Sequence, residues 1–212
     1  MPSIDELEHA IAIGDPGCKF VVARTESARR AVREFTRGGR LVGFTRGQFS
    51  LLDLMRALLL KTGPVDVVIS TWTAGIRDAQ NARWLARRGA IRSLMFLVDR
   101  SFASRQPKYA RKLADVFGDE AVRYTRTHAK FALLTNDDWS VCVRSSMNLN
   151  TNARFEQFDI DDNAELCAFV REHVDELIAR APPGWNPPRG EVERGFARTR
   201  RPLSKTKTAR AK

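Results

Sequence analysis

The sequence predicts an α/β fold in which a mixed β-sheet is flanked by helices on both faces. Residues 65–71 and 93–99 are aliphatic, β-branched runs without the alternation of a half-exposed strand, so we expect strands that are covered on both faces. Helical patterns at 50–61, 78–88 and 108–117 alternate with these runs, and they predict the covering layers.

Five elements are predicted before the first buried strand. Ser27 is a favourable N-cap for one of them, and Gly63-Pro64 ends another. The elements are a helix at 4–13, a strand at 19–23, a helix at 27–35, a strand at 41–44 and a helix at 50–61.

The second half of the chain continues the alternation and then turns to strands. Gly89 and Gly118 end the helices at 78–88 and 108–117. A strand at 122–127 follows, then a hairpin of two strands across an Asn/Asp-rich turn, a short strand and a final amphipathic helix. The hairpin strands are expected at 130–134 and 139–143, the short strand at 158–160 and the final helix at 164–179.

The charge is concentrated at the C-terminus. The chain has 36 Lys and Arg against 25 Asp and Glu, a net charge of +11. Residues 189–212 carry nine of the basic residues and two glutamates, behind a proline-rich stretch at 182–188. We therefore expect one folded domain at 1–181 and a linker with a flexible basic tail at 182–212. The tail is either a polyanion-binding arm, with Arg198, Arg200 and Arg201 as candidate contacts, or a solubilising extension.

The composition indicates where the protein is located and which kinds of chemistry it is expected to use. The acidic N-terminus lacks the pattern of a secretory signal, and no run is apolar enough to span a membrane, so a cytoplasmic protein is expected. Of the three cysteines, Cys142 and Cys167 lie in apolar contexts typical of buried thiols. The chain has no carboxylate or His/Cys set with metal-ligand spacing and no glycine-rich phosphate loop, so no metal or other cofactor is expected.

Two polar segments follow one another within residues 127–156. His128 and Lys130 would share one face of an extended segment, because side chains two residues apart point the same way. Ser146 and Asn148 have the same spacing at the end of the neighbouring strand. These four groups can converge on a phosphate, with His128 as nucleophile and Lys130 offsetting the negative charge.

This arrangement resembles the phospholipase D-like phosphodiesterases, whose mark is H-x-K-x4-D followed by G-S-x-N. The matching residues are His128-Ala129-Lys130 and Ser145-Ser146-Met147-Asn148, with Ser145 in the glycine position as a candidate substrate contact. The order of predicted elements from about residue 41 to residue 179 is also similar to one such domain. The resemblance implies a phosphohistidine on His128, with Lys130, Asn148 and Ser146 on the phosphate oxygens and Glu156 orienting the imidazole.

The resemblance also predicts a homodimer. Members of this family use two H-x-K motifs, one histidine attacking phosphorus and the other protonating the leaving oxygen. This chain has one H-x-K, so the complete site would form between two copies, as in the single-motif nucleases.

One position departs from the pattern. Thr135 stands where the family motif has aspartate, which in the family is chiefly structural. The site is therefore either catalytic, or the phosphate pocket of a DNA-binding module that has lost turnover.

The basic tail and the arginines at 77–88 favour nucleic acid, DNA first, as the substrate. The sequence thus predicts an endonuclease, with the DNA-binding module and a phospholipid-modifying enzyme as alternatives, the last because polybasic arms also bind anionic membranes. Thr71 and Trp72 end a buried strand, where open α/β sheets present ligand-contacting loops. Trp72 would either stack on a base or pack against the protein.

Overall fold

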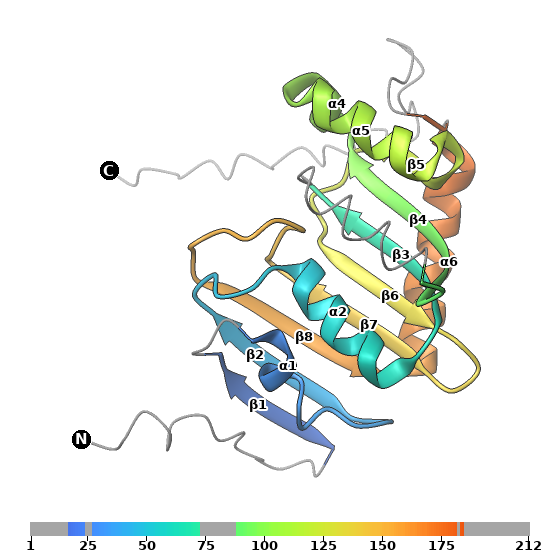
Figure 1. The fold of residues 1–212 in the computed structure, drawn as a ribbon. Helices are drawn as coiled ribbons and strands as arrows, with labels where there is room; N and C mark the ends of the chain where they lie inside the picture. The colour runs from blue at the N-terminus through green and yellow to red at the C-terminus, as the bar shows by residue number, and fades with distance from the viewer. Residues whose placement is uncertain (1–16, 24–26, 73–87, 182, 185–212) are drawn as a thin grey trace, which may run out of the picture.

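The computed structural model describes residues 17–23, 27–72, 88–181 and 183–184, and these residues form an eight-stranded sheet with helices on both faces (Figure 1). The expected fold class is therefore confirmed. The elements are β1 (Cys18–Val22), α1 (Ala28–Ala31), β2 (Arg40–Thr45), α2 (Leu51–Thr62), β3 (Val65–Thr71), β4 (Ile91–Asp99), α4 (Arg100–Arg105), α5 (Pro107–Phe117), η2 (Asp119–Ala121), β5 (Val122–Thr125), β6 (Phe131–Thr135), β7 (Ser140–Ser145), β8 (Glu156–Asp162) and α6 (Ala164–Arg180).

The sheet is mixed, with the strand order β1-β2-β8-β7-β6-β3-β4-β5. The outer pairs β1·β2, β3·β4 and β4·β5 are parallel. The pairs between them, β2·β8, β8·β7, β7·β6 and β6·β3, are antiparallel. Strand β3, expected as a central strand, lies between β6 and β4 and buries both of its faces.

The larger core lies between the sheet and helices α1, α2, α4 and α5. Helix α2 contributes most of the helical part, because Leu54, Met55 and Leu58 are almost completely buried. Burying one such side chain stabilises the fold by about 1.5–3 kcal/mol. The helix begins with a capping box between Ser50 and Asp53 and ends at Gly63, which adopts a positive φ of 69°.

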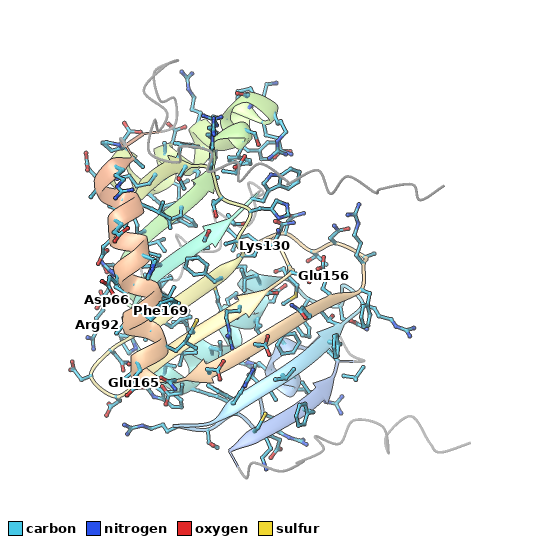
Figure 2. All side chains as sticks on the ribbon, turned by 180° about the vertical axis from the view of Figure 1, so that it is seen from behind. Asp66, Arg92, Lys130, Glu156, Glu165 and Phe169 are labelled. Carbon is cyan, nitrogen blue, oxygen red and sulfur yellow. The ribbon has the colours of Figure 1, made fainter. Side chains whose placement is uncertain are left out.

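Helix α6 covers the other face and forms a second, smaller core (Figures 1 and 2). Its Cys167 and Val174 pack with Val68, Leu133 and Cys142 of the sheet. All three cysteines are free, and burial raises the thiol pKa of Cys142 to about 11 and that of Cys167 to about 12. The expectation of buried thiols at these two positions is therefore confirmed.

Several boundaries differ from the expected ones. The helix expected at 27–35 is helical over Ala28–Ala31 only, although Ser27 caps it as predicted. Helix α4 was not predicted, and the strand expected to run to residue 127 ends at Thr125. The helix expected at 4–13 lies outside the described residues, as does nearly all of the one expected at 78–88.

Two described residues past the end of α6, Pro183 and Gly184, contact the folded domain. Pro183 bridges Arg123, and the Gly184 amide donates to the carbonyls of Asp119 and Val122, at 3.1 and 3.3 Å. Over the described part of the chain, no helix has the length and apolar content needed to cross a membrane.

Candidate active site

The predicted site residues of the sheet gather at one of its edges. Strands β1, β2, β3, β4, β5 and β7 end at this edge and the antiparallel β6 and β8 begin there; we call it the site edge. Thr71 ends β3, Ser145 ends β7, Glu156 begins β8, and Lys130 directly precedes β6. Figure 2 shows Lys130 and Glu156 at this edge, with Arg92 towards the opposite end of the sheet.

His128 and Lys130 are side by side, as their spacing predicted, but they lie just before β6 rather than within a strand. Lys130 Nζ is 3.4 Å from His128 Nδ1 and donates to the His128 carbonyl at 3.1 Å. The imidazole is exposed and Lys130 is half-buried. A cation is thus held beside an accessible imidazole, which suits the attack of that imidazole on an anionic phosphate.

Hydrogen bonds to neighbouring strands hold the segment that carries this pair. The Thr127 amide donates to the Asp99 carboxylate at 3.2 Å, at the end of β4. The buried Ser70 hydroxyl of β3 donates to the Ala129 carbonyl at 2.9 Å. The Ser145 amide of β7 also donates to the Lys130 carbonyl at 2.9 Å. Together these bonds fix His128 relative to the ends of β3, β4 and β7.

Ser145 and Ser146 connect the end of β7 to the start of β8. Ser145 Oγ donates to the Gln157 carbonyl at 2.8 Å, and the Gln157 amide donates to Ser146 Oγ at 2.9 Å. Ser146 Oγ also bonds the carboxylate of Glu156. Among the described hydrogen bonds, Glu156 therefore bonds Ser146, whereas the family resemblance had implied the imidazole of His128. Its carboxylate instead acts on Lys130 electrostatically.

The pKa of Lys130 is lowered from the ordinary lysine value, because burial disfavours its charged form, and the Glu156 carboxylate partly opposes this shift. We expect the ε-methylene signal of Lys130 to titrate below the ordinary value of 10.5 in an NMR pH titration of lysine-labelled protein, assigned with Lys130→Arg. In Glu156→Gln the opposing charge is gone while an acceptor for Ser146 remains, so the Lys130 pKa should fall further. Asp159→Asn, on the same strand, is the matched control and should leave it unchanged; an unchanged or higher pKa in Glu156→Gln would contradict the assignment.

Asn148 follows β7 and faces the start of α2. Its carbonyl accepts from the Leu51 amide at 3.2 Å, which fixes the loop against that helix. Its side-chain oxygen Oδ1 is buried and has no hydrogen-bond partner in the described structure, and the same holds for Asn150. A buried polar group without a protein partner is uncommon and is often completed by water or a ligand. Asn150 is a site-edge residue that sequence reasoning did not single out.

Trp72 borders the histidine, and its neighbour Arg105 was missed at the sequence level. The ring centroids of Trp72 and His128 are 5.7 Å apart, with an interplanar angle of 54°. The Arg105 guanidinium carbon lies 3.8 Å from the centroid of the Trp72 ring. Arg105 ends α4, which Asp99 caps by accepting from the Ser101 amide at 2.9 Å. The sequence Asp99-Arg100-Ser101, an N-cap directly after a strand, was the available signal.

The structure therefore brings together eight of the predicted site residues. They are Thr71, Trp72, His128, Lys130, Ser145, Ser146, Asn148 and Glu156. Arg198, Arg200 and Arg201 lie outside the described residues.

The chain matches no protein-family model, and it matches no curated protein sequence. Among solved structures it is similar to NucT from Helicobacter pylori, with a TM-score of 0.50 and 15% identity over 68% of this chain and 99% of that one. The polyphosphate kinase of Porphyromonas gingivalis is also similar, with a TM-score of 0.50 and 15% identity over 74% of this chain and 28% of the kinase. A phospholipase D family member, Nuc from Salmonella typhimurium, has a TM-score of 0.48 and 14% identity over 68% of this chain and 97% of its own.

The chain has a phospholipase D-like fold. Within this fold, Thr135 ends β6, about 16 Å along the chain from Lys130 at the usual strand rise, and so it lies away from the site edge. The adjacent turn is held by Asn136, whose side-chain amide donates to the carbonyls of Thr62 and Pro64, each at 3.0 Å. The replacement of the motif aspartate by threonine thus removes no group from the site edge.

Proposed function

We propose that this protein is a phosphodiesterase that cleaves DNA through a phosphohistidine formed on His128, at a site shared by two copies of the chain. The observation that carries the proposal is the exposed imidazole of His128 beside the Lys130 ammonium, with their nitrogens 3.4 Å apart, on a phospholipase D-like fold. The segment that carries both groups is held by hydrogen bonds of Thr127 and Ala129 to neighbouring strands, which favours binding of a substrate without rearrangement.

The proposed reaction has two balanced steps. First, a lone pair of the His128 imidazole forms a bond to phosphorus, the bond from phosphorus to the leaving oxygen breaks, and His128 of the partner subunit gives that oxygen its proton. Second, the partner's His128, now neutral, takes a proton from water, whose oxygen attacks phosphorus and breaks the bond to nitrogen. Lys130 offsets the phosphate charge, and no metal is required because protein groups supply nucleophile, acid and charge stabilisation.

The need for two histidines supports the dimer. One His128 is bonded to phosphorus when the leaving oxygen needs its proton, so a second acid is required. His9 and His173 are the only other histidines of the sequence. His173 lies on the exposed side of α6, where its Nδ1 is 2.8 Å from the Phe169 carbonyl. A second copy of His128 across a twofold axis is the simplest source of the acid.

Charge at the site edge supports a nucleic-acid substrate. Four exposed arginines lie at or close to the ends of strands or helices on this edge, in addition to Lys130. The four are Arg46, Arg105, Arg126 and Arg154. The carboxylate of Glu156 bonds Ser146, and that of Asp99 accepts from Ser101 and Thr127. A positive rim attracts the phosphates of DNA and makes binding weaken with salt.

The decisive experiment is incubation of the purified full chain with plasmid DNA in excess EDTA, with its mass measured by light scattering. We expect nicked and linear products in EDTA and a mass twice that of one chain. Cleavage that appears only after Mg²⁺ is added would contradict the metal-independent mechanism, and cleavage by a stable monomer would contradict the shared site. Salt-sensitive DNA binding without cleavage in either buffer would point to the silent DNA-binding module.

A further inference from the structure

Trp72 and Arg105 form a stacked pair at the site edge, next to the proposed nucleophile. The Arg105 guanidinium covers the indole ring at 3.8 Å, and the indole lies 5.7 Å from the His128 ring. Arg105 Nη2 donates to the Trp72 carbonyl at 3.3 Å, and its Nε donates to Ser101 Oγ at 3.1 Å. Trp72 follows the end of β3 and Arg105 ends helix α4, so a tertiary contact rather than a local turn builds the pair.

The pair has the properties of a binding surface rather than of core packing. Arg105 is exposed, Trp72 is half-buried, and no carboxylate among the described residues forms a salt bridge with Arg105. These bonds to Trp72 and Ser101 use only part of the donor capacity of the guanidinium, so further N–H groups can bind a phosphate oxygen. Planar guanidinium and indole groups are also surfaces on which nucleobases stack.

We propose that the Trp72–Arg105 pair binds an unpaired nucleotide next to the scissile phosphate, so that single-stranded DNA is the preferred substrate. This inference rests on the proposed function and adds the strand state of the substrate to it. The base stacks on the pair while Arg105 contacts a neighbouring phosphate, which places the phosphodiester at His128.

The preference for a single strand has a physical cause. In a duplex, both faces of each base are covered by neighbouring base pairs, so a base reaches the pair only after it has been unpaired and unstacked. In a single strand that cost is small. The arginines of the rim bind phosphates of either form, so they add affinity without this discrimination.

The test measures binding alone, in a His128→Asn background that prevents turnover. Fluorescence anisotropy at fixed salt compares a short labelled single strand with a blunt duplex of the same sequence. The variants are Trp72→Ala, Trp72→Phe, Arg105→Ala and Arg105→Lys. Arg92→Ala is the control, because it removes one exposed arginine from the opposite end of β4. Near-ultraviolet circular dichroism and the thermal midpoint check that each variant is folded.

Trp72→Ala should weaken single-strand binding about tenfold and duplex binding by less than about twofold. Trp72→Phe, which keeps a flat ring, should stay within about threefold of its parent. Arg105→Lys, which keeps the charge and loses the plane, should weaken single-strand binding more than duplex binding, while Arg92→Ala should change both by the same small factor.

Equal losses for both DNA forms in Trp72→Ala, or no loss, would overturn the inference, as would a parent that binds no single strand. If Arg105→Lys binds single-stranded DNA as tightly as its parent, charge alone acts at Arg105, and its stacking role is overturned. Failure of the proposed function looks different, because an inactive wild type would leave the selective loss in Trp72→Ala intact.

Discussion

Replacing His128 with alanine is expected to reduce the rate of DNA cleavage by about a thousandfold or more, because in the proposed mechanism the nucleophile and the acid of the shared site are both copies of this residue. The measurement is the initial rate of plasmid nicking in EDTA. His173→Ala is the matched control, since this exposed imidazole of α6 bonds only the Phe169 carbonyl among the described contacts. Loss of activity in His173→Ala, or retention in His128→Ala, would remove His128 from the mechanism.

Mixing wild-type and His128→Ala subunits tests the shared site directly. If both histidines serve one site, only dimers with two wild-type subunits are active, so an equal mixture after subunit exchange retains about a quarter of the wild-type rate. Independent sites, one in each subunit, would retain about half instead. The DNA-binding affinity of the mixture, measured in parallel, should stay near that of the wild type, because the mutation removes no cation from the rim.

Gly47→Ala is expected to lower the free energy of unfolding by about 2–5 kcal/mol, through backbone strain and a steric clash. Gly47 has φ = 83°, a region that side chains other than glycine rarely occupy. A Cβ there would lie 2.1 Å from the Asn152 carbonyl oxygen and 2.7 Å from the Ala153 Cα. Both are backbone atoms, so the loop itself would have to move.

Urea unfolding measures this change, and Gly38→Ala is the control. Gly38 has φ = 66°, and an added Cβ there meets no atom within 4 Å, so it should cost only about 1–2 kcal/mol. The difference between the variants isolates the clash. We also expect slower DNA cleavage in Gly47→Ala, because the displaced loop connects Asn148 with Glu156. Equal destabilisation by the two substitutions would contradict the close packing of these loops at the site edge.

The secondary structure was largely predictable because most of its signals are local. Strand β3 matches the predicted range, and helix α2 is shifted by one residue at each end, since a β-branched run and a helical leucine pattern mark them. Helix α4 was missed because it has only six residues and buries only Phe102. Helices this short show little periodicity, so the cap at Asp99 was the remaining signal.

The candidate site was predictable in its composition but not in its contacts. The H-x-K spacing indicated that His128 and Lys130 would be neighbours, and the structure confirms this at 3.4 Å. The spacing could not show that the Glu156 carboxylate bonds Ser146, or that Arg105 stacks on Trp72. Trp72 and Arg105 are separated by 33 positions in the chain, and nothing in either local sequence names the other.

By itself, the sequence determined most of the strands and helices, which of their faces are buried, and which residues are the candidate nucleophile and its neighbouring cation. Those properties follow from residue type and periodicity, which act over a few neighbouring positions. Only the tertiary structure decided the strand order, and with it which strand ends and loops meet at the site edge. The physical reason is that a buried strand needs hydrogen-bonding neighbours and an apolar cover, and many other strands could supply them. Long-range packing selects one pairing among these, and that pairing brings His128, Glu156 and Trp72 to one edge of the sheet.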